Sequence, residues 1–366
     1  MQIDHLSYGS DQSGLICAYI FERNQAGRLI YTSDALQWLH EQKQYDQTQR
    51  TQQAQQDVED DSAEPSAANP NSGVNSFIWL HFNLSNVSAE KWLHEHADLP
   101  EEFYETLHEG SRSTRIEHAE NSLIAVVNDV LHDFAFEASD IATLWLSVTK
   151  NVMVSARRKP LQSVDRLRKA VNQGEVFHAP AELLTHLLRD QADVLIGIVR
   201  NAIKRVDSIE DNLLADRLNH KRANLGELRR VLVRLQRLLA PEPAALFRLL
   251  QKPPLWVDES DVQELRQSTE EFAVVLSDMA SLQERIKLLQ EEIAASVNEQ
   301  NNRSLFVLTI VTVLALPINI MAGLLGMNVG GIPLAQNDSG FWIVVGIVAT
   351  FTVVLGWLAF RGRDRE

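Results

Sequence analysis

Two long apolar segments near the end of the chain dominate its hydropathy pattern. The first covers residues 305–325 and the second residues 341–360, and neither contains a charged side chain. About 20 helical residues, each rising about 1.5 Å, cross a hydrocarbon core of about 30 Å. Because lipid offers no partners to backbone N–H and C=O groups, each segment is predicted to be a helix. The pattern therefore predicts a transmembrane hairpin over residues 303–366, with a loop at 326–340.

Upstream of this hairpin the pattern changes from strand-like to helical. Residues 1–175 combine period-two runs with shorter helical patterns, which predicts an α/β domain. Residues 176–302 are predicted to form a helical stalk. Its last helix is expected to continue into the first membrane helix, because residues 255–316 contain no Pro or Gly. The expected strands are 15–21, 28–31, 77–82, 122–130, 142–149 and 151–156. The expected helices are 33–42, 88–96, 101–108, 161–171, 180–219, 222–239 and 258–325.

Residues 43–76 interrupt the α/β pattern. They are rich in Gln, Asp, Ser, Asn, Ala and Pro and contain almost no large apolar side chain. Such a stretch buries too little apolar surface to offset the entropy lost on ordering. It is predicted to be a disordered insertion, and no function is assigned to it.

The long stalk helix carries one apolar stripe, whose members recur three and four residues apart: Met279, Leu282, Ile286, Leu289, Ile293 and Val297. A stripe on so long a helix requires a partner. The partner is either the helices predicted over 180–239 or further copies of the same chain, and both are expected.

Charge and cysteine content exclude several classes. The net charge of −15 argues against a nucleic-acid partner, which requires a basic surface. The single cysteine, Cys17, rules out an internal disulfide framework and a Cys-rich zinc site. We find no nucleophile elbow, P-loop, HExxH sequence or clustered carboxylate pair, so the protein is predicted not to be an enzyme and to need no cofactor. The basic residues Arg229, Arg230, Arg234 and Arg237 are interpreted as a solvated helix face.

Charged residues around the hairpin predict its orientation. No basic, apolar signal peptide opens the chain. Arg303 precedes the first membrane segment, and Arg361, Arg363 and Arg365 follow the second, whereas the loop carries only Asp338. The positive-inside rule then predicts cytoplasmic N- and C-termini and an outward-facing loop. The expected location is a bacterial inner membrane, with membrane lipid as one partner.

The first membrane helix carries a polar stripe. Thr309, Thr312 and Asn319 fall within an arc of about 100° at about 100° per residue. The same arc also holds Asn302, Leu305, Leu316 and Gly323. Either Asn319 bonds this helix to its neighbours, or the arc lines a water-filled pore. A pore requires several copies of the chain, because two apolar helices cannot enclose one. The alignment of the threonines with both asparagines favours the pore.

The end of this helix provides a resemblance. The run Pro317-Ile318-Asn319-Ile320-Met321-Ala322-Gly323-Leu324-Leu325-Gly326-Met327-Asn328 resembles the CorA family of divalent-cation transporters, whose signature is Gly-Met-Asn between the two C-terminal membrane helices. The continuation Val329-Gly330-Gly331-Ile332-Pro333 is similar to the zinc-associated ZntB branch.

The resemblance implies a funnel-shaped homopentamer. Gly326, Met327 and Asn328 would form the ion-selecting outer mouth, with Asn328 as a ring. Asn319 would form an inner ring, and both asparagines would bind the cation through its hydration water. Leu305, Leu308 and Leu316 would form a hydrophobic gate. The loop lacks the family's acidic residue after its proline, which leaves Asp338 as its only acid.

The transported ion is not fixed by the residues. Neither membrane segment contains His or Cys, the ligands that zinc prefers. The resemblance favours Zn²⁺, with Mg²⁺ or Co²⁺ as the alternative in the same fold. His94 and His96 are interpreted as part of a solvated helix, with a metal site as the alternative. A different class, a membrane-anchored scaffold or sensor, is disfavoured because an anchor needs neither the polar arc nor the Gly-Met-Asn turn.

Overall fold

The computed structural model describes residues 9–59, 76–109, 114–119, 121–137, 140–214, 221–327 and 338–363. It contains two compact units, Met1–Lys287 (unit 1) and Leu288–Glu366 (unit 2). Their boundary lies inside the predicted stalk, and the sequence-based division at residues 175 and 302 stays a prediction. The helices are α1 (Thr32–Glu59), α2 (Val87–His96), α3 (Glu101–Glu109), α4 (Gln162–Asn172), α5 (Pro180–Leu214), α6 (Lys221–Leu239), α7 (Pro241–Gln251), α8 (Glu259–Leu325) and α9 (Gly340–Arg363).

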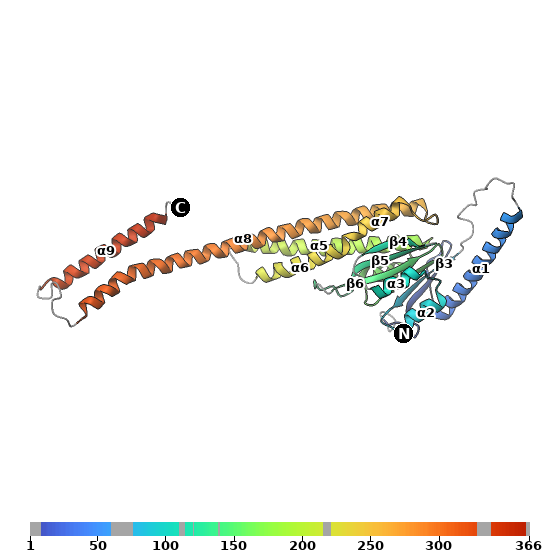
Figure 1. Cartoon of the computed structure of the whole chain (residues 1–366), viewed down its shortest axis with the longest axis horizontal. Helices are drawn as coiled ribbons and strands as arrows, with labels where there is room; N and C mark the ends of the chain where they lie inside the picture. Colours follow the sequence, from blue (N-terminus) through green and yellow to red (C-terminus); the bar gives the residue numbers. More distant parts are fainter. Residues whose placement is uncertain are drawn as a thin grey trace. The chain divides into compact units, whose positions relative to one another are not determined.

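Unit 1 is built on one mixed sheet (Figure 1). Its order, within the described residues, is β2-β1-β3-β7-β6-β5-β4. Only β3 and β7 pair in parallel, and the other neighbours are antiparallel. The strands are β1 (Leu15–Glu22), β2 (Arg28–Ile30), β3 (Ser76–Asn83), β4 (Arg115–Ala119), β5 (Ser122–Val130), β6 (Ile141–Val148) and β7 (Val152–Arg157).

Both faces of the sheet are buried, which makes unit 1 a layered α/β domain. Along β3, Phe77 and Trp79 enter one apolar cluster, whereas Ile78, Leu80 and Phe82 enter the other. This follows from the two-residue period of a strand. The first cluster also takes side chains from α4, α5, α7 and the start of α8, and the second takes them from α2 and α3. Near-continuous apolar strands such as β3 are the expected sequence of a sheet covered on both faces.

Three elements differ from the sequence-based expectation. Helix α1 continues to Glu59, although residues 43–76 were expected to be disordered; its sequence has no Gly or Pro and is rich in Gln, which favours helix. Residues 60–75 of that predicted insertion lie outside the described residues. Helix α7 was not predicted, because Pro241 and Pro243 directly follow the expected helix over 222–239, and prolines there are typical of a helix end. The structure places Pro241 at the start of α7. Backbone N–H groups in the first turn of a helix have no acceptor within the helix, so the missing N–H of proline costs no hydrogen bond there. The short strand β4 was also missed.

Helices α5, α6 and the first part of α8 run alongside one another in unit 1 (Figure 1). The apolar stripe of α8 is buried there from Met279 to Leu282 and Ile286. Gln283 Nε2 on α8 donates to Gln236 Oε1 on α6 at 2.9 Å. Arg285 pairs with Asp207 at 2.8 Å and with Glu210, both on α5. The expected packing of the stripe against the helices of 180–239 is therefore confirmed for this part of α8.

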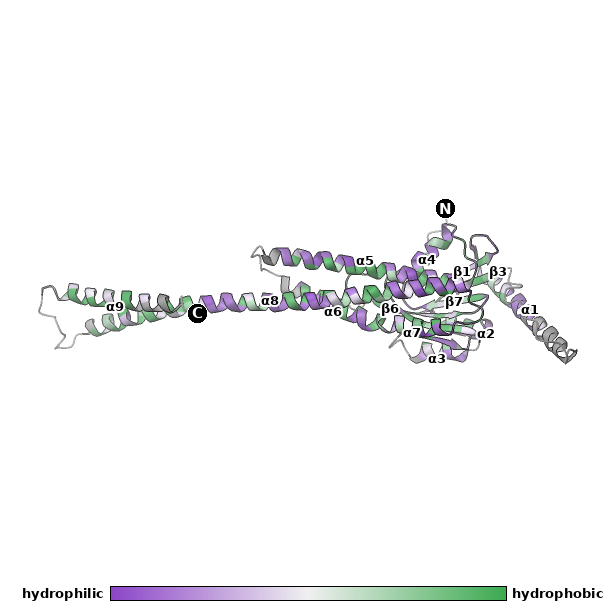
Figure 2. Cartoon of the chain, turned by 90° about the horizontal axis from the view of Figure 1, so that it is seen from above, coloured by the Kyte–Doolittle hydropathy of each residue, from purple (hydrophilic) through white to green (hydrophobic). Residues whose placement is uncertain are grey.

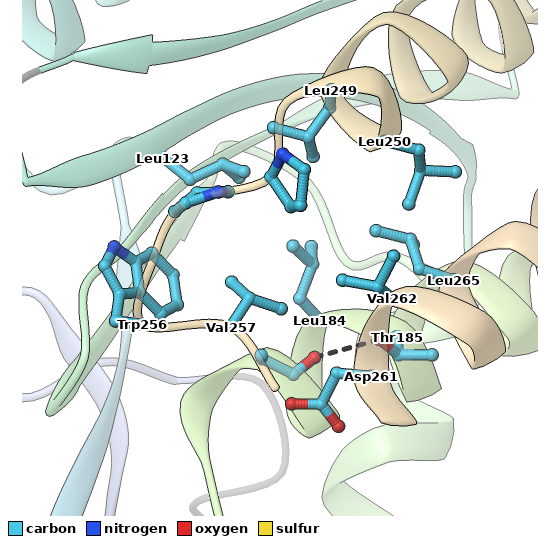
Figure 3. Close-up of a pocket in the computed structure, with 13 residues that line it drawn as sticks. Leu123, Leu184, Thr185, Leu249, Leu250, Trp256, Val257, Asp261, Val262 and Leu265 are labelled. Carbon is cyan, nitrogen blue, oxygen red and sulfur yellow. Dashed lines mark hydrogen bonds between the residues drawn. The ribbon is translucent and has the colours of Figure 1, made fainter. Parts of the chain in front are cut away.

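A small apolar cavity marks the junction of β5, α5, α7 and α8 (Figure 3). Its volume is ≈ 20 Å³, about the space of one water molecule. Leu184, Leu249 and Val262 line it, and Thr185 donates its hydroxyl to the carbonyl of Ala181 beside it. Such a cavity is too small for any ligand but water, so we treat it as part of the core.

Two buried carboxyl groups lie where β5 meets α4, α5 and α7. Glu242 is 1% exposed and Asp129 is 2% exposed. Gln191 Nε2 donates to Glu242 Oε2 at 3.1 Å and to the carbonyl of Asn128 at 2.7 Å. Ser163 donates its backbone N–H to Asp129 Oδ2 at 3.0 Å. Burial raises the pKa of Glu242 to about 8 and the pKa of Asp129 to about 6, because ionisation there loses hydration.

Candidate functional site

The polar arc of the first membrane segment lies on α8, within unit 2. Figure 2 shows the C-terminal part of α8 and helix α9 largely in the colours of apolar residues. Within the described residues, one helix, Glu259–Leu324, contains a stretch long and apolar enough to cross a membrane. A second, shorter apolar stretch covers Gly340–Val354. The second crossing predicted over 341–360 therefore stays a prediction, although α9 is helical throughout that range.

Every predicted pore-lining position lies on α8, and each is exposed in the single chain. The set is Asn302, Leu305, Thr309, Thr312, Leu316, Asn319 and Gly323. Consecutive members are separated by three and four residues in alternation, which keeps them on one side of an α-helix. Leu305, Leu308 and Leu316 of the predicted gate are 60%, 62% and 57% exposed. No residue of this membrane stretch is buried by the rest of the described chain.

The two threonines satisfy their hydroxyl protons within the helix. Thr309 donates to the carbonyl of Leu305 at 2.8 Å, and Thr312 donates to that of Leu308 at 2.9 Å. Such bonds are common in membrane helices and do not by themselves indicate a pore. They leave the oxygen lone pairs free to accept a hydrogen bond from water. The threonines are thus compatible with either interpretation of the arc.

Asn319 provides the stronger signal. Its carboxamide is exposed and makes no hydrogen bond to any described residue. In the hydrocarbon region an unbonded carboxamide costs several kcal/mol, about 2–7 by transfer measurements. It therefore requires a partner from another subunit or from water. Pro317 lies within α8 two residues earlier and removes one donor from the helix ladder.

Helix α8 ends at the Gly-Met-Asn sequence. The N–H of Gly326 donates to the carbonyl of Ala322 at 2.9 Å, and Met327 is 51% exposed. A Cβ at position 326 would lie 2.9 Å from that carbonyl oxygen, so the turn favours glycine here. Asn328 and the rest of the loop to residue 337 lie outside the described residues. The structure therefore brings Gly326 and Met327 to the end of the polar arc and does not test the position of Asn328.

The described residues offer no direct metal centre of the usual kind. They contain no group of three or more His, Cys, Asp or Glu side chains that could hold a metal ion. His94 stacks on Tyr104 with 3.6 Å between ring centroids, and His96 lies 5.1 Å from Trp92. The polar side chains along the arc offer amide and hydroxyl oxygens as possible ligand atoms. Oxygen ligands suit hard cations and can accept hydrogen bonds from their hydration water.

Comparison with known proteins decides the family. A model of the family described as CorA-like Mg²⁺ transporter protein matches residues 74–361. The chain belongs to this family. The match includes the sheet of unit 1 from β3 onward, the whole of α8 and almost all of α9. The expected family is thereby confirmed, and the family is one of transporters rather than enzymes.

Individual relatives within the CorA-like family support the same fold. The divalent cation transporter CmaX of Pseudomonas aeruginosa is 30% identical over 292 residues, covering 78% of this chain and 86% of that protein. The zinc transport protein ZntB of Yersinia pseudotuberculosis is 21% identical, covering 78% and 87%. The full-length CmaX structure covers 98% of this chain and all of that one, with a TM-score of 0.75 at 25% identity. The CorA magnesium transporter of Methanocaldococcus jannaschii covers 93% and 96%, with a TM-score of 0.68 at 18% identity.

Proposed function

We propose that this protein forms a homo-oligomeric pore through which hydrated divalent cations cross a bacterial inner membrane. The observation that carries the proposal is the exposed polar arc of α8, from Asn302 to Gly323, which ends at Gly326-Met327-Asn328. In a single chain the threonine hydroxyls bond to their own helix, whereas the Asn319 carboxamide has no hydrogen-bond partner among the described residues. Several copies around one axis would place them on water, and α9 of each copy would face lipid.

The two asparagines would act on the cation through its water shell. A carboxamide oxygen is a neutral acceptor, so a ring of them binds hydrated M²⁺ without holding it too tightly to leave. Asn328 would form the outer ring together with Gly326 and Met327, and Asn319 would form the inner ring. Leu305, Leu308 and Leu316 would close the pore by excluding water when the ring of helices tightens. A pentamer is the assembly that the family resemblance implies.

Zinc is the cation that we propose, with magnesium or cobalt as the second candidate. The Val-Gly-Gly-Ile-Pro continuation after Asn328 supports zinc, and so does similarity to proteins named ZntB. The family description names Mg²⁺, and CmaX is named for divalent cations in general. The chain offers no thiol or imidazole in either membrane segment, so discrimination would act on hydrated ions. The termini are proposed to be cytoplasmic.

The proposal predicts the effect of replacing the inner asparagine. Asn319→Leu removes the only carboxamide at mid-membrane depth in α8 and is expected to lower cation flux by about 10-fold or more, since a hydrogen-bonding ring becomes apolar. Flux is measured in liposomes that contain separate Zn²⁺ and Mg²⁺ reporters, with and without a pH gradient. The control is Ile318→Leu, which alters a neighbouring side chain outside the arc.

The same assay separates the candidates. Zinc flux that responds to the pH gradient supports the zinc assignment, whereas magnesium flux indifferent to the gradient supports the second candidate. A normal flux in the Asn319→Leu protein, with the same subunit number as the wild type, would instead favour the helix-packing interpretation of the arc.

A further inference from the structure

An open groove in unit 1 plays no part in the proposed pore. It lies between α5, α6 and the segment that follows β5, and its volume is ≈ 840 Å³. Sites for small organic ligands commonly measure about 300–1,000 Å³. The side chains that matter for its chemistry are Phe136, Glu137, Lys204, Arg205, Glu227 and Arg230. All of these residues are far in sequence from the polar arc of α8.

Three cations line this groove, and none of them has a carboxylate partner within the part of the chain that the structure describes. Lys204 and Arg205 come from α5 and Arg230 from α6, and all three are exposed. None of them forms an ion pair with another described residue. The chain as a whole has a net charge of −15, yet basic residues outnumber acidic ones between residues 200 and 237. A local concentration of unpaired arginine and lysine favours a phosphate-bearing ligand, because both recognise phosphate oxygens.

One wall of the groove is a strained aromatic residue. Phe136 has a φ of 64°, a left-handed conformation that bulky side chains rarely adopt. The carboxylate of Asp140 holds the segment by accepting the N–H groups of Ala135 at 2.8 Å and Glu137 at 3.0 Å. Arg205 lies over the Phe136 ring, 4.0 Å from its centroid. This cation–π contact places the Arg205 guanidinium against the Phe136 ring at the edge of the groove.

We propose that this groove binds a nucleoside polyphosphate. Its phosphates would lie against Lys204 and Arg230, and its base would stack on the Phe136–Arg205 pair. Glu137 and Glu227 would repel a pure polyanion, but they can accept hydrogen bonds from ribose hydroxyls and base amino groups. The combination of unpaired cations, an aromatic surface and two carboxylates therefore fits a nucleotide better than an acidic lipid or a nucleic-acid chain.

ATP is the probe for this site, with inorganic triphosphate and adenosine as comparators. Binding is measured by calorimetry on the full-length protein in detergent. We expect saturable ATP binding with one site per chain. The double substitution Lys204→Ala/Arg230→Ala is expected to raise the Kd about 10-fold or more, because each charged hydrogen bond contributes appreciably to affinity. Phe136→Leu is expected to weaken ATP binding while leaving triphosphate binding unchanged.

Arg234→Ala is the matched control, because Arg234 is an exposed arginine on α6 that does not line the groove. It is expected to leave the Kd for ATP unchanged. Substitutions of exposed helical side chains rarely unfold a protein, and the elution volume and Tm of each variant check this. Three results would overturn the proposal: no saturable ATP binding, an unchanged Kd in the double variant, or triphosphate binding as tight as that of ATP. None of them bears on cation transport.

Discussion

Asn328→Ala is expected to abolish cation flux while the protein still folds and assembles. Alanine removes the only side-chain oxygen of the Gly-Met-Asn sequence, so the outer mouth loses the acceptors that we propose to bind the water shell of the cation. A hydrated divalent cation must then leave bulk water without compensation, and its hydration is strong. The expected flux in reporter-loaded liposomes is that of liposomes without protein.

Asn337→Ala is the matched control for this prediction. Asn337 lies in the same loop and outside the Gly-Met-Asn sequence, so its replacement is expected to leave flux close to that of the wild type. Tm and subunit number in detergent report on folding and assembly for both variants. Near-normal uptake by the Asn328→Ala protein would contradict the proposed outer ring.

The second large effect concerns Glu242 and the pH dependence of stability. Burial raises the pKa of Glu242 from 4.5 to about 8. The unfolded chain therefore releases this proton at lower pH than the folded protein does. The protonated Glu242 side chain therefore contributes to the free energy of unfolding. This contribution is fully present below about pH 4.5 and is lost as pH rises through about 8, with a total of the order of 5 kcal/mol. Asp129 adds a smaller decrease of the same sign at lower pH, because burial raises its pKa to about 6.

Glu242→Gln is expected to remove most of this alkaline destabilisation. The introduced amide keeps the size of the side chain, accepts the hydrogen bond from Gln191 and can donate to Gln191 Oε1, which has no partner in the described structure. The Tm of the variant is expected to exceed that of the wild type at pH 9 and to match it near pH 5.

Glu105→Gln, an exposed glutamate on α3, is the control for Glu242 and is expected to follow the wild type at every pH. The measurement is Tm by intrinsic fluorescence from pH 5 to pH 9 in one detergent. Parallel curves of Tm against pH for the wild type and Glu242→Gln would contradict the prediction. They would show that ionisation of Glu242 does not destabilise the folded protein.

Local patterns made most of the fold predictable. The strands around Trp79 and Leu146 have dense apolar runs, and α8 lacks any Pro or Gly that could stop it before the membrane stretch. The start of α7 at Pro241 was missed, because proline both ends one helix and fits the first turn of the next. The length of α1 was missed because its second half has no apolar stripe, which is the pattern from which a helix is usually predicted. Only the helix propensity of its residues favours a helix there.

The candidate site was only partly within reach of the sequence. Helical spacing alone placed Asn302, Thr309 and Asn319 on one face of α8. The hydrogen bond from the Thr309 hydroxyl to the carbonyl of Leu305 depends on the side-chain rotamer, which the spacing does not determine. The burial of Glu242 was not predictable either, because it depends on Gln191 and Asp129, which tertiary packing brings to it from distant parts of the chain. The groove beside Phe136 depends on packing in the same way.

The central claim is that the polar arc of α8 faces a common axis of several identical subunits. Cysteine cross-linking in native membranes tests it, with Leu316→Cys on the arc and Ile318→Cys about 200° away around the helix. The native Cys17 does not interfere, because it is buried and burial raises its pKa to about 11. The account predicts rapid disulfide-linked dimers from Leu316→Cys under mild oxidation and none from Ile318→Cys. Dimers from Ile318→Cys alone, or none from either variant, would contradict it.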